Sequence, residues 1–154
     1  MRWRLALALS CLALVALAGC GGETAADREA RMQAARADSL AMAQELYNAT
    51  VFDTVSWESP DARVQRGALV WRASCEKCHG EGGRGDGLGA QQLGIDVPSF
   101  LVPDWKYTYE ADSLRERIFV GLAGEMPNWG LHGLGYRDID AAVAYINTLV
   151  SAAR

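Results

Sequence analysis

Apolar residues recur at helical spacing in two stretches of the chain. One set keeps offsets of 0, 3, 4, 7 and 11 residues, and a later set keeps offsets of 0, 4, 7 and 11 (Val64, Gly67, Ala68, Trp71, Cys75; Ile139, Val143, Ile146, Val150). Such spacing places the residues on one face of an α-helix. The pattern predicts an early helix over 64–75 and a last helix over 139–150, with Asp138 at or near the N-cap of the last helix.

Between these helices the sequence predicts a loop and one short helix. Residues 80–94 contain seven glycines, which indicates a loop. Ser113 and Glu116 have the spacing of a capping box, which predicts a helix from Leu114 to about Gly121. No stretch of residues 61–154 alternates as a β-strand does, so the predicted fold of this domain is all-α.

Residues 20–60 differ in composition from the domain that follows. Residues 24–48 are rich in Ala, Arg, Glu, Gln and Met, which favours a helix. Their apolar positions form no clean stripe, so we expect a mostly exposed helical linker; a partner-binding helix is the alternative. Residues 51–57 alternate like a strand but have no other strand to pair with, so we expect them to lie extended against the domain.

The N-terminus has the features of an export signal. A short basic start precedes an apolar run over 5–17, and about 13 residues are too few for a spanning helix, which needs ~20. The run ends in Leu17-Ala18-Gly19-Cys20, which resembles the lipobox of bacterial lipoproteins. The resemblance implies that residues 1–19 are removed as a signal peptide and that Cys20 carries lipid. An ordinary secretory signal cut near Gly19 and an uncleaved anchor helix are the alternatives.

The charge of the chain limits its partners. The formal charge is −4, and removal of residues 1–19 leaves 13 basic and 19 acidic side chains, a charge of −6. This balance argues against a nucleic-acid partner. Lys77 and Lys106 are the only lysines, so steering toward a strongly acidic protein is not expected.

The cysteines indicate a covalently bound cofactor. With Cys11 in the signal and Cys20 carrying lipid, Cys75 and Cys78 remain, in the motif Cys75-Glu76-Lys77-Cys78-His79. This Cys-x-x-Cys-His arrangement is typical of haem c attachment: two thiols add to the vinyl groups, and His79 reaches the iron. The alternatives are a redox disulfide and a zinc site, which prefers four nitrogen or sulfur ligands. We predict one haem c.

A second axial ligand must come from elsewhere in the sequence. Met126 stands in a Gly-rich loop with Pro127 directly after it, whereas Met32 and Met42 fall in the predicted linker helix. A thioether or an imidazole is usual in an electron carrier. Met126 is therefore the predicted ligand; His132 and an open site are the alternatives.

These motifs together resemble the class I cytochrome c family over residues 61–154. The matching features are the first helix with its haem motif, a Gly-Asp-Gly loop, the Met-Pro pair and the last helix (64–80; 83–87; Met126-Pro127; Ala141, Tyr145, Ile146, Leu149). The resemblance implies that Gly67 and Tyr145 meet where the two helices cross. Family members often carry Gly-Pro where this chain has Gly89-Ala90, and the proline carbonyl accepts a hydrogen bond from the proximal imidazole.

Some polar and aromatic residues could accompany the haem. Trp105, Tyr107 and Tyr109 alternate with polar residues and could either contact a haem propionate or belong to the core. Arg84, Arg115 and Arg117 are expected to be solvated surface charges.

The resemblance implies an electron carrier rather than an enzyme. We expect a single-haem cytochrome that passes single electrons between redox partner proteins of a bacterial respiratory or photosynthetic chain. The lipid on Cys20 would hold it in the cell envelope, at a membrane, with the haem domain in the periplasm. The alternatives are a haem-binding subunit of a larger oxidoreductase, or a gas-sensing or peroxidase haem protein with an exchangeable sixth ligand.

Overall fold

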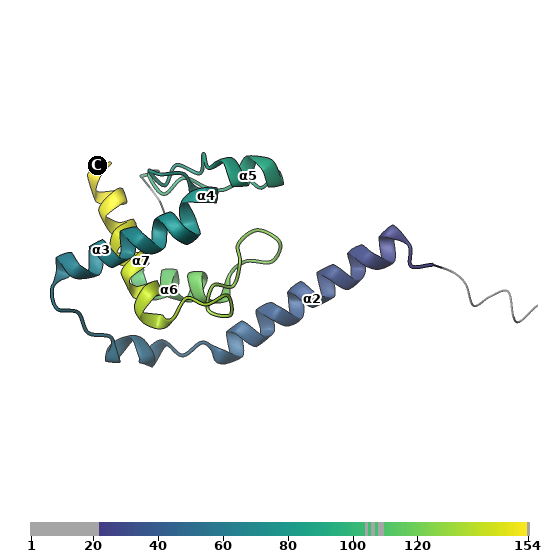
Figure 1. Ribbon diagram of the computed structural model, residues 1–154, viewed down its shortest axis with the longest axis horizontal. Helices are drawn as coiled ribbons and strands as arrows, with labels where there is room; N and C mark the ends of the chain where they lie inside the picture. The colour runs from purple at the N-terminus through teal and green to yellow at the C-terminus, as the bar shows by residue number, and fades with distance from the viewer. Residues whose placement is uncertain (1–21, 104, 106, 108–109, 154) are drawn as a thin grey trace, which may run out of the picture. The chain divides into compact units, whose positions relative to one another are not determined.

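The computed structural model describes residues 22–103, 105, 107 and 110–153, and within these ranges the fold is helical. The elements are α2 Ala25–Leu46, the 3₁₀ helix η1 Ala49–Thr54, α3 Pro60–Val70, the π-helical turn η2 Trp71–Cys75, α4 Glu76–His79, α5 Leu88–Leu93, α6 Ala111–Val120 and α7 Tyr136–Ala152 (Figure 1). An isolated antiparallel β-bridge joins Leu122 and Met126. The predicted all-α fold is confirmed. The signal segment 1–19, Cys20 and Tyr109 lie outside the described residues.

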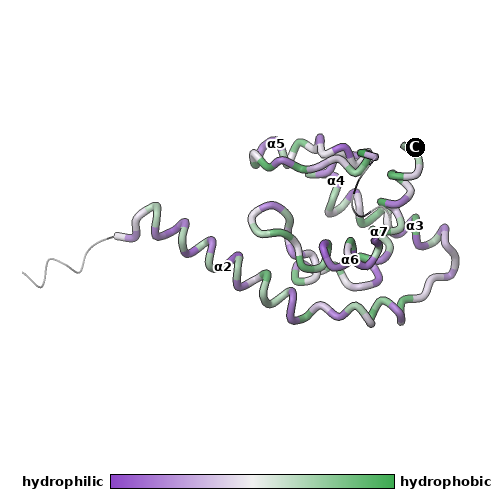
Figure 2. The backbone as a smooth tube through the Cα atoms, turned by 180° about the vertical axis from the view of Figure 1, so that it is seen from behind, coloured by the Kyte–Doolittle hydropathy of each residue, from purple (hydrophilic) through white to green (hydrophobic). Residues whose placement is uncertain are grey.

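Helix α2 runs through the boundary between two compact units. Described residues up to Ala35 belong to the first unit, and the second unit is Arg36–Arg154. Thr24 and Asp27 begin the helix with a reciprocal cap: the Asp27 amide donates to the Thr24 hydroxyl (3.1 Å), and the Thr24 amide donates to the Asp27 carboxylate (3.0 Å). Hydrophilic and hydrophobic positions are mixed along α2, and its N-terminal half is exposed (Figure 2).

The crossing of α3 and α7 organises the second unit (Figure 1). Ser59 caps α3 by accepting a hydrogen bond from the Ala62 amide (3.1 Å), with Pro60 in the first turn. A Cβ placed on Gly67 would overlap the Ala141 carbonyl and the Tyr145 Cβ. The predicted meeting of Gly67 and Tyr145 is therefore confirmed, since only a missing side chain allows this approach.

The predicted inner face of α7 forms much of the core. Ile139, Val143, Ile146 and Val150 are all buried. The helix begins one turn before Ile139, with Gly135 as N-cap, and Asp138 lies in the first turn. The Asp138 carboxylate accepts a hydrogen bond from Nε of Arg66 (2.7 Å), so it joins α7 to α3.

Three local predictions differ from the structure. Helix α6 begins at Ala111 after the N-cap Glu110, so Ser113 lies inside the helix and forms no capping box. The glycine-rich stretch contains the short helix α5, which Gly94 ends in the left-handed conformation (φ 64°). Residues 49–54 form η1 rather than an extended segment, because the Asn48 side chain caps the turn by accepting from the Thr50 amide (3.1 Å).

The segment before α3 packs against the domain. Ala43 is fully buried and Phe52 belongs to the main core. The Phe52 ring lies 5.0 Å from that of Tyr136, and the Tyr47 ring lies 5.5 Å from that of Phe119. The compact unit therefore begins well before Asp61, the boundary expected from the sequence.

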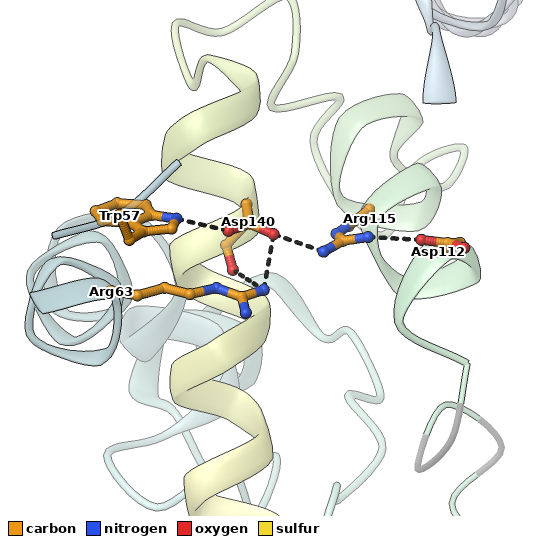
Figure 3. A network of polar contacts seen from close by, with 5 residues as sticks. All are labelled: Trp57, Arg63, Asp112, Arg115 and Asp140. Atoms are coloured by element: carbon orange, nitrogen blue, oxygen red, sulfur yellow. Dashed lines mark hydrogen bonds and ion pairs between the residues drawn. The ribbon is translucent and has the colours of Figure 1, made fainter. Parts of the chain in front are cut away.

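A buried carboxylate on α7 joins this segment to three helices (Figure 3). Asp140 is 3% exposed and accepts from Arg63 of α3 (2.7 Å), Arg115 of α6 (2.6 Å) and the Trp57 indole (2.8 Å). Arg115 also contacts Asp112 (2.6 Å). The expectation that Arg115 is a solvated surface charge is wrong, because its side chain is only 18% exposed and paired with Asp140.

Candidate functional site

A cavity of about 350 Å³ lies at the end of the haem-attachment motif. Its walls come from η2 and α4, residues 95–100, α6, residues 122–129 and α7, and most of its lining is apolar. The four residues predicted to bind the cofactor, Cys75, Cys78, His79 and Met126, all line it.

The motif reaches the cavity through a change of helix type. Helix α3 passes into the π-helical turn η2, and α4 then carries Cys78 and His79 until Gly80 ends it with a positive φ of 78°. A π turn inserts one extra residue and is frequent at functional sites. The apolar spacing alone does not predict this turn. The following glycine loop folds back on the motif, where the Gly85 amide donates to the His79 carbonyl (2.9 Å).

Cys75 and Cys78, the cysteines in the described part of the chain, are not joined in a disulfide. Burial, and to a lesser degree the neighbouring Cys78, raises the pKa of Cys75 to about 12. Cysteines that exchange disulfides typically have a lowered pKa, because the thiolate is the reactive form. The Cys75 environment therefore disfavours the redox-disulfide alternative.

His79 lies in an apolar environment that favours the neutral imidazole. Burial lowers its pKa to about 4, so the ring can offer a lone pair at neutral pH. Its Nδ1 is buried and has no hydrogen-bond partner among the described residues, and the same holds for Nε1 of Trp71. Zinc would need more ligands around this ring, and no group of three or more His, Cys, Asp or Glu suited to a metal occurs in the described part of the chain.

The departure from Gly-Pro has a visible structural consequence. The Ala90 carbonyl stands where the resemblance implied a proline carbonyl, and it accepts from the amides of Gly94 and Ile95 at the end of α5. It is thus engaged in the helix cap, and Nδ1 of His79 has no hydrogen-bond partner among the described residues.

Met126 sits in a loop held by its own backbone. The Leu122 amide donates to the Met126 carbonyl (2.8 Å), and the Met126 amide donates to the Leu122 carbonyl (3.0 Å). Gly121 closes the loop with φ 83°, and a Cβ there would collide with the Met126 carbonyl. The structure thus brings Met126 to the cavity.

The other candidate ligands do not line the cavity. His132 is exposed, and its Nδ1 lies 3.0 Å from the Asn128 carbonyl oxygen. Met32 and Met42 are 46% and 55% exposed on α2.

Aromatic side chains form one wall. The Phe100 ring lies 4.8 Å from the His79 ring and 4.8 Å from the Trp105 ring. Trp105 is 7% exposed, and Tyr107 packs beside it, so both belong to the core and line the cavity. Sequence reasoning missed Phe100, because no motif or helical spacing marks it.

Arg117 was expected at the surface but contributes to the cavity wall. Its Nε donates to the Tyr107 hydroxyl (3.2 Å) and its Nη1 donates to the Gly121 carbonyl (3.2 Å). It is the one Lys or Arg side chain among the described residues that line the cavity. The Arg117 guanidinium could form an ion pair with a carboxylate of a bound cofactor.

The residues present fit a covalently bound haem. An apolar cavity offers two thiols, a neutral imidazole and a thioether, together with buried nitrogens on Trp71 and His79 that have no hydrogen-bond partner among the described residues. An all-α domain with this arrangement defines a c-type cytochrome.

Comparison with known proteins identifies the family. Residues 62–146, more than half of the chain, match the family described as cytochrome c oxidase, cbb3-type, subunit III. The chain belongs to this family, whose members are cytochromes c, so haem c is the cofactor that it implies. No solved structure matches the chain significantly.

The relatives are longer proteins. The chain is 32% identical over 87 residues to the cbb3-type cytochrome c oxidase subunit FixP of Azorhizobium caulinodans, covering 56% of this chain and 27% of that protein. It is 29% identical over 96 residues to subunit CcoP of Cereibacter sphaeroides, covering 62% and 31%. The chain thus matches less than a third of the length of these relatives. None of the helices in the described ranges is both long and apolar enough to span a membrane.

Proposed function

We propose that this chain is a haem-binding electron-transfer subunit of a larger respiratory oxidoreductase, and that it carries one haem c. The sequence alone favoured an independent carrier, with a subunit as the alternative. The relatives are named as subunits of cbb3-type oxidases, which favours the subunit. The observation that carries the electron-transfer role is that Cys75, Cys78, His79 and Met126 line one cavity.

Each of these residues has a distinct task. Bound haem c supplies an iron that takes up and releases one electron. Cys75 and Cys78 would hold the macrocycle through thioether bonds, and His79 and Met126 would ligate the iron. Because both ligands are held by folded backbone, little would have to rearrange when the charge changes. The apolar walls exclude water, and Arg117 with Tyr107 could bind a haem propionate.

The proposed location of the subunit in the cell rests on the N-terminal motif. Lipid on Cys20 would keep the subunit at a membrane of the cell envelope, with residues 61–154 as the haem domain in the periplasm. The lipobox Leu17-Ala18-Gly19-Cys20 supports this location. Membrane complexes that oxidise or reduce cytochromes are the partners expected there.

The experiment begins with native membranes. Mild detergent extraction and native electrophoresis should place the haem-stained chain in a band with terminal oxidase activity. A haem-stained band only at the size of the single chain would contradict the subunit proposal and favour an independent carrier.

The same preparations test the ligand set. The ferric protein should show the weak near-infrared band of thioether ligation, and Met126→Ala should abolish it and open the iron to carbon monoxide. His132→Ala is the control and should leave the spectrum unchanged. A band that survives Met126→Ala, or a wild type that binds carbon monoxide rapidly, would contradict the ligand assignment and favour a sensor or enzyme.

A further inference from the structure

A buried amide beside the Met126 loop takes its partner from helix α2. Asn128, two residues after Met126, is 5% exposed. Its side-chain Nδ2 donates to the hydroxyl of Ser39 (2.6 Å) and to the Ser39 carbonyl (3.1 Å). Ser39 and Asn128 both belong to the compact unit Arg36–Arg154.

Helix α2 meets the loop region at further points. A Cβ on Gly124, at the loop tip, would lie 3.8 Å from the Arg36 guanidinium. One turn beyond Ser39, Ala43 is fully buried, and Tyr47 packs edge-on against Phe119 of α6. The C-terminal part of α2, residues 36–46, is therefore packed within the unit Arg36–Arg154, as is Tyr47 directly after it.

The loop is also attached to α6, where Nη1 of Arg117 donates to the Gly121 carbonyl (3.2 Å). Its internal pairing between Leu122 and Met126 stabilises the loop but does not tie it to the domain. After Asn128, the amides of Trp129 and Gly130 donate to carbonyls of α6 (3.2 and 3.0 Å). The Asn128 side chain therefore adds a connection between the Met126 loop and α2.

We propose that Ser39 and Asn128 are positioning residues for Met126, so that the docked part of α2 sets how often the thioether leaves the iron. This inference rests on the proposed function, because Met126 as ligand belongs to it. Local opening of a loop depends on the contacts that hold it, and a buried amide without its partner favours the open form. The N-terminal segment would thus act on the haem site through one hydrogen-bonded pair.

The test measures ligand exchange in the full-length ferric holoprotein. Imidazole must wait for Met126 to leave, so its binding rate reports loop opening. Asn128→Asp removes the donor to the Ser39 carbonyl and places a buried carboxylate against that carbonyl, even though the Ser39 hydroxyl could donate to it, and this variant should raise the rate roughly tenfold. Ser39→Ala removes one bond and should have a smaller effect in the same direction. Ser39→Thr keeps the hydroxyl and should restore the wild-type rate.

Gln44→Ala is the matched control. Gln44 is on the same helix, and its side-chain amide donates to Glu116 of α6 (2.9 Å) rather than to a residue of the Met126 loop. Its removal should leave the imidazole rate unchanged. Hydrogen exchange of residues 121–131 should rise in Asn128→Asp and not in Gln44→Ala, a readout that does not depend on haem activity.

Met126→Ala distinguishes a wrong ligand assignment from a wrong positioning role. If it binds imidazole no faster than wild type, Met126 is not the ligand and the proposed function fails at its site. If Met126→Ala is fast but Asn128→Asp and Ser39→Ala match wild type, the ligand assignment stands and the positioning role is wrong. Equal acceleration by Gln44→Ala and Asn128→Asp would also overturn the positioning role, since general loosening of α2 would explain it.

Discussion

Asp140→Asn removes the charge at the centre of the network in Figure 3. The Asp140 side chain is 5% exposed, and two guanidinium groups donate to the same carboxylate oxygen, from Arg63 at 2.7 Å and Arg115 at 2.6 Å. The side-chain oxygen of an asparagine could still accept from both guanidiniums, but it would carry no charge, and the asparagine would present N–H groups where the other oxygen accepted from the Trp57 indole. The substitution therefore leaves positive charge partly buried and uncompensated.

The expected loss follows from the exposure of the partners. Removing one member of a buried ion pair costs about 3–5 kcal/mol. Arg63 is 32% exposed and Arg115 keeps its contact with Asp112, so the low end of that range applies here. We expect about 3 kcal/mol, which for a folded unit of this size lowers Tm by roughly 10 °C.

Asp138→Asn on the same helix provides the control. Asp138 pairs with Arg66 (2.7 Å), and the two side chains are 24% and 48% exposed. An exposed pair contributes about 1 kcal/mol or less, so Tm should fall by no more than about 4 °C. Thermal unfolding of the ferric holoprotein, followed by circular dichroism, compares the two. Equal small losses in both variants would refute the argument that burial makes the Asp140 network important.

Two further predictions concern the haem site and the anchor. Arg117→Gln should lower the reduction potential by a few tens of mV, because about 1 kcal/mol corresponds to roughly 40 mV for one electron; redox titration should show a smaller change for the control Arg72→Gln, whose side chain is exposed outside the cavity wall. An equal change in both variants would show that Arg117 has no specific role at the haem site. Cys20→Ser should move the haem-stained chain from the membrane to the periplasmic fraction; unchanged retention would show that a spanning anchor or a bound partner holds it.

Local periodicity predicted the parts of the fold that depend on neighbours in sequence. The apolar spacing of Ile139, Val143 and Ile146 placed the inner face of α7 correctly, because one helix face is buried against one core. The capping-box spacing at Ser113 failed, since the helix starts earlier and the spacing alone does not establish where a chain first becomes helical. The π turn at Trp71–Cys75 likewise has no periodic signal.

The contacts between distant segments could not be predicted in this way. Residues 36–58 mix polar and apolar positions without a helical stripe, and their docking depends on a few anchors: Ala43, which is fully buried, and Phe52 and Trp57, whose side chains contact Tyr136 and Asp140 of α7. In the sequence, Arg117 has no feature that distinguishes it from an exposed arginine on a helix surface. Only the fold places its side chain beside Tyr107. Cys75, Cys78 and His79 were predictable as candidates because adjacent residues form the motif, whereas the arrival of Met126 at the same cavity required the tertiary fold.

Ala90, where the resemblance implied a proline, links the fold to the site. Proline has no amide hydrogen and restricts the preceding residue to extended conformations, which disfavours a helix through 88–93. With alanine there, α5 forms, and the Ala90 carbonyl accepts from Gly94 and Ile95 to end it. The carbonyl that could have oriented His79 is thereby occupied in the helix cap, and the Nδ1 is left without a partner among the described residues. The orientation of the imidazole then depends on packing, against Phe100 at 4.8 Å and Trp71 at 5.8 Å between ring centroids.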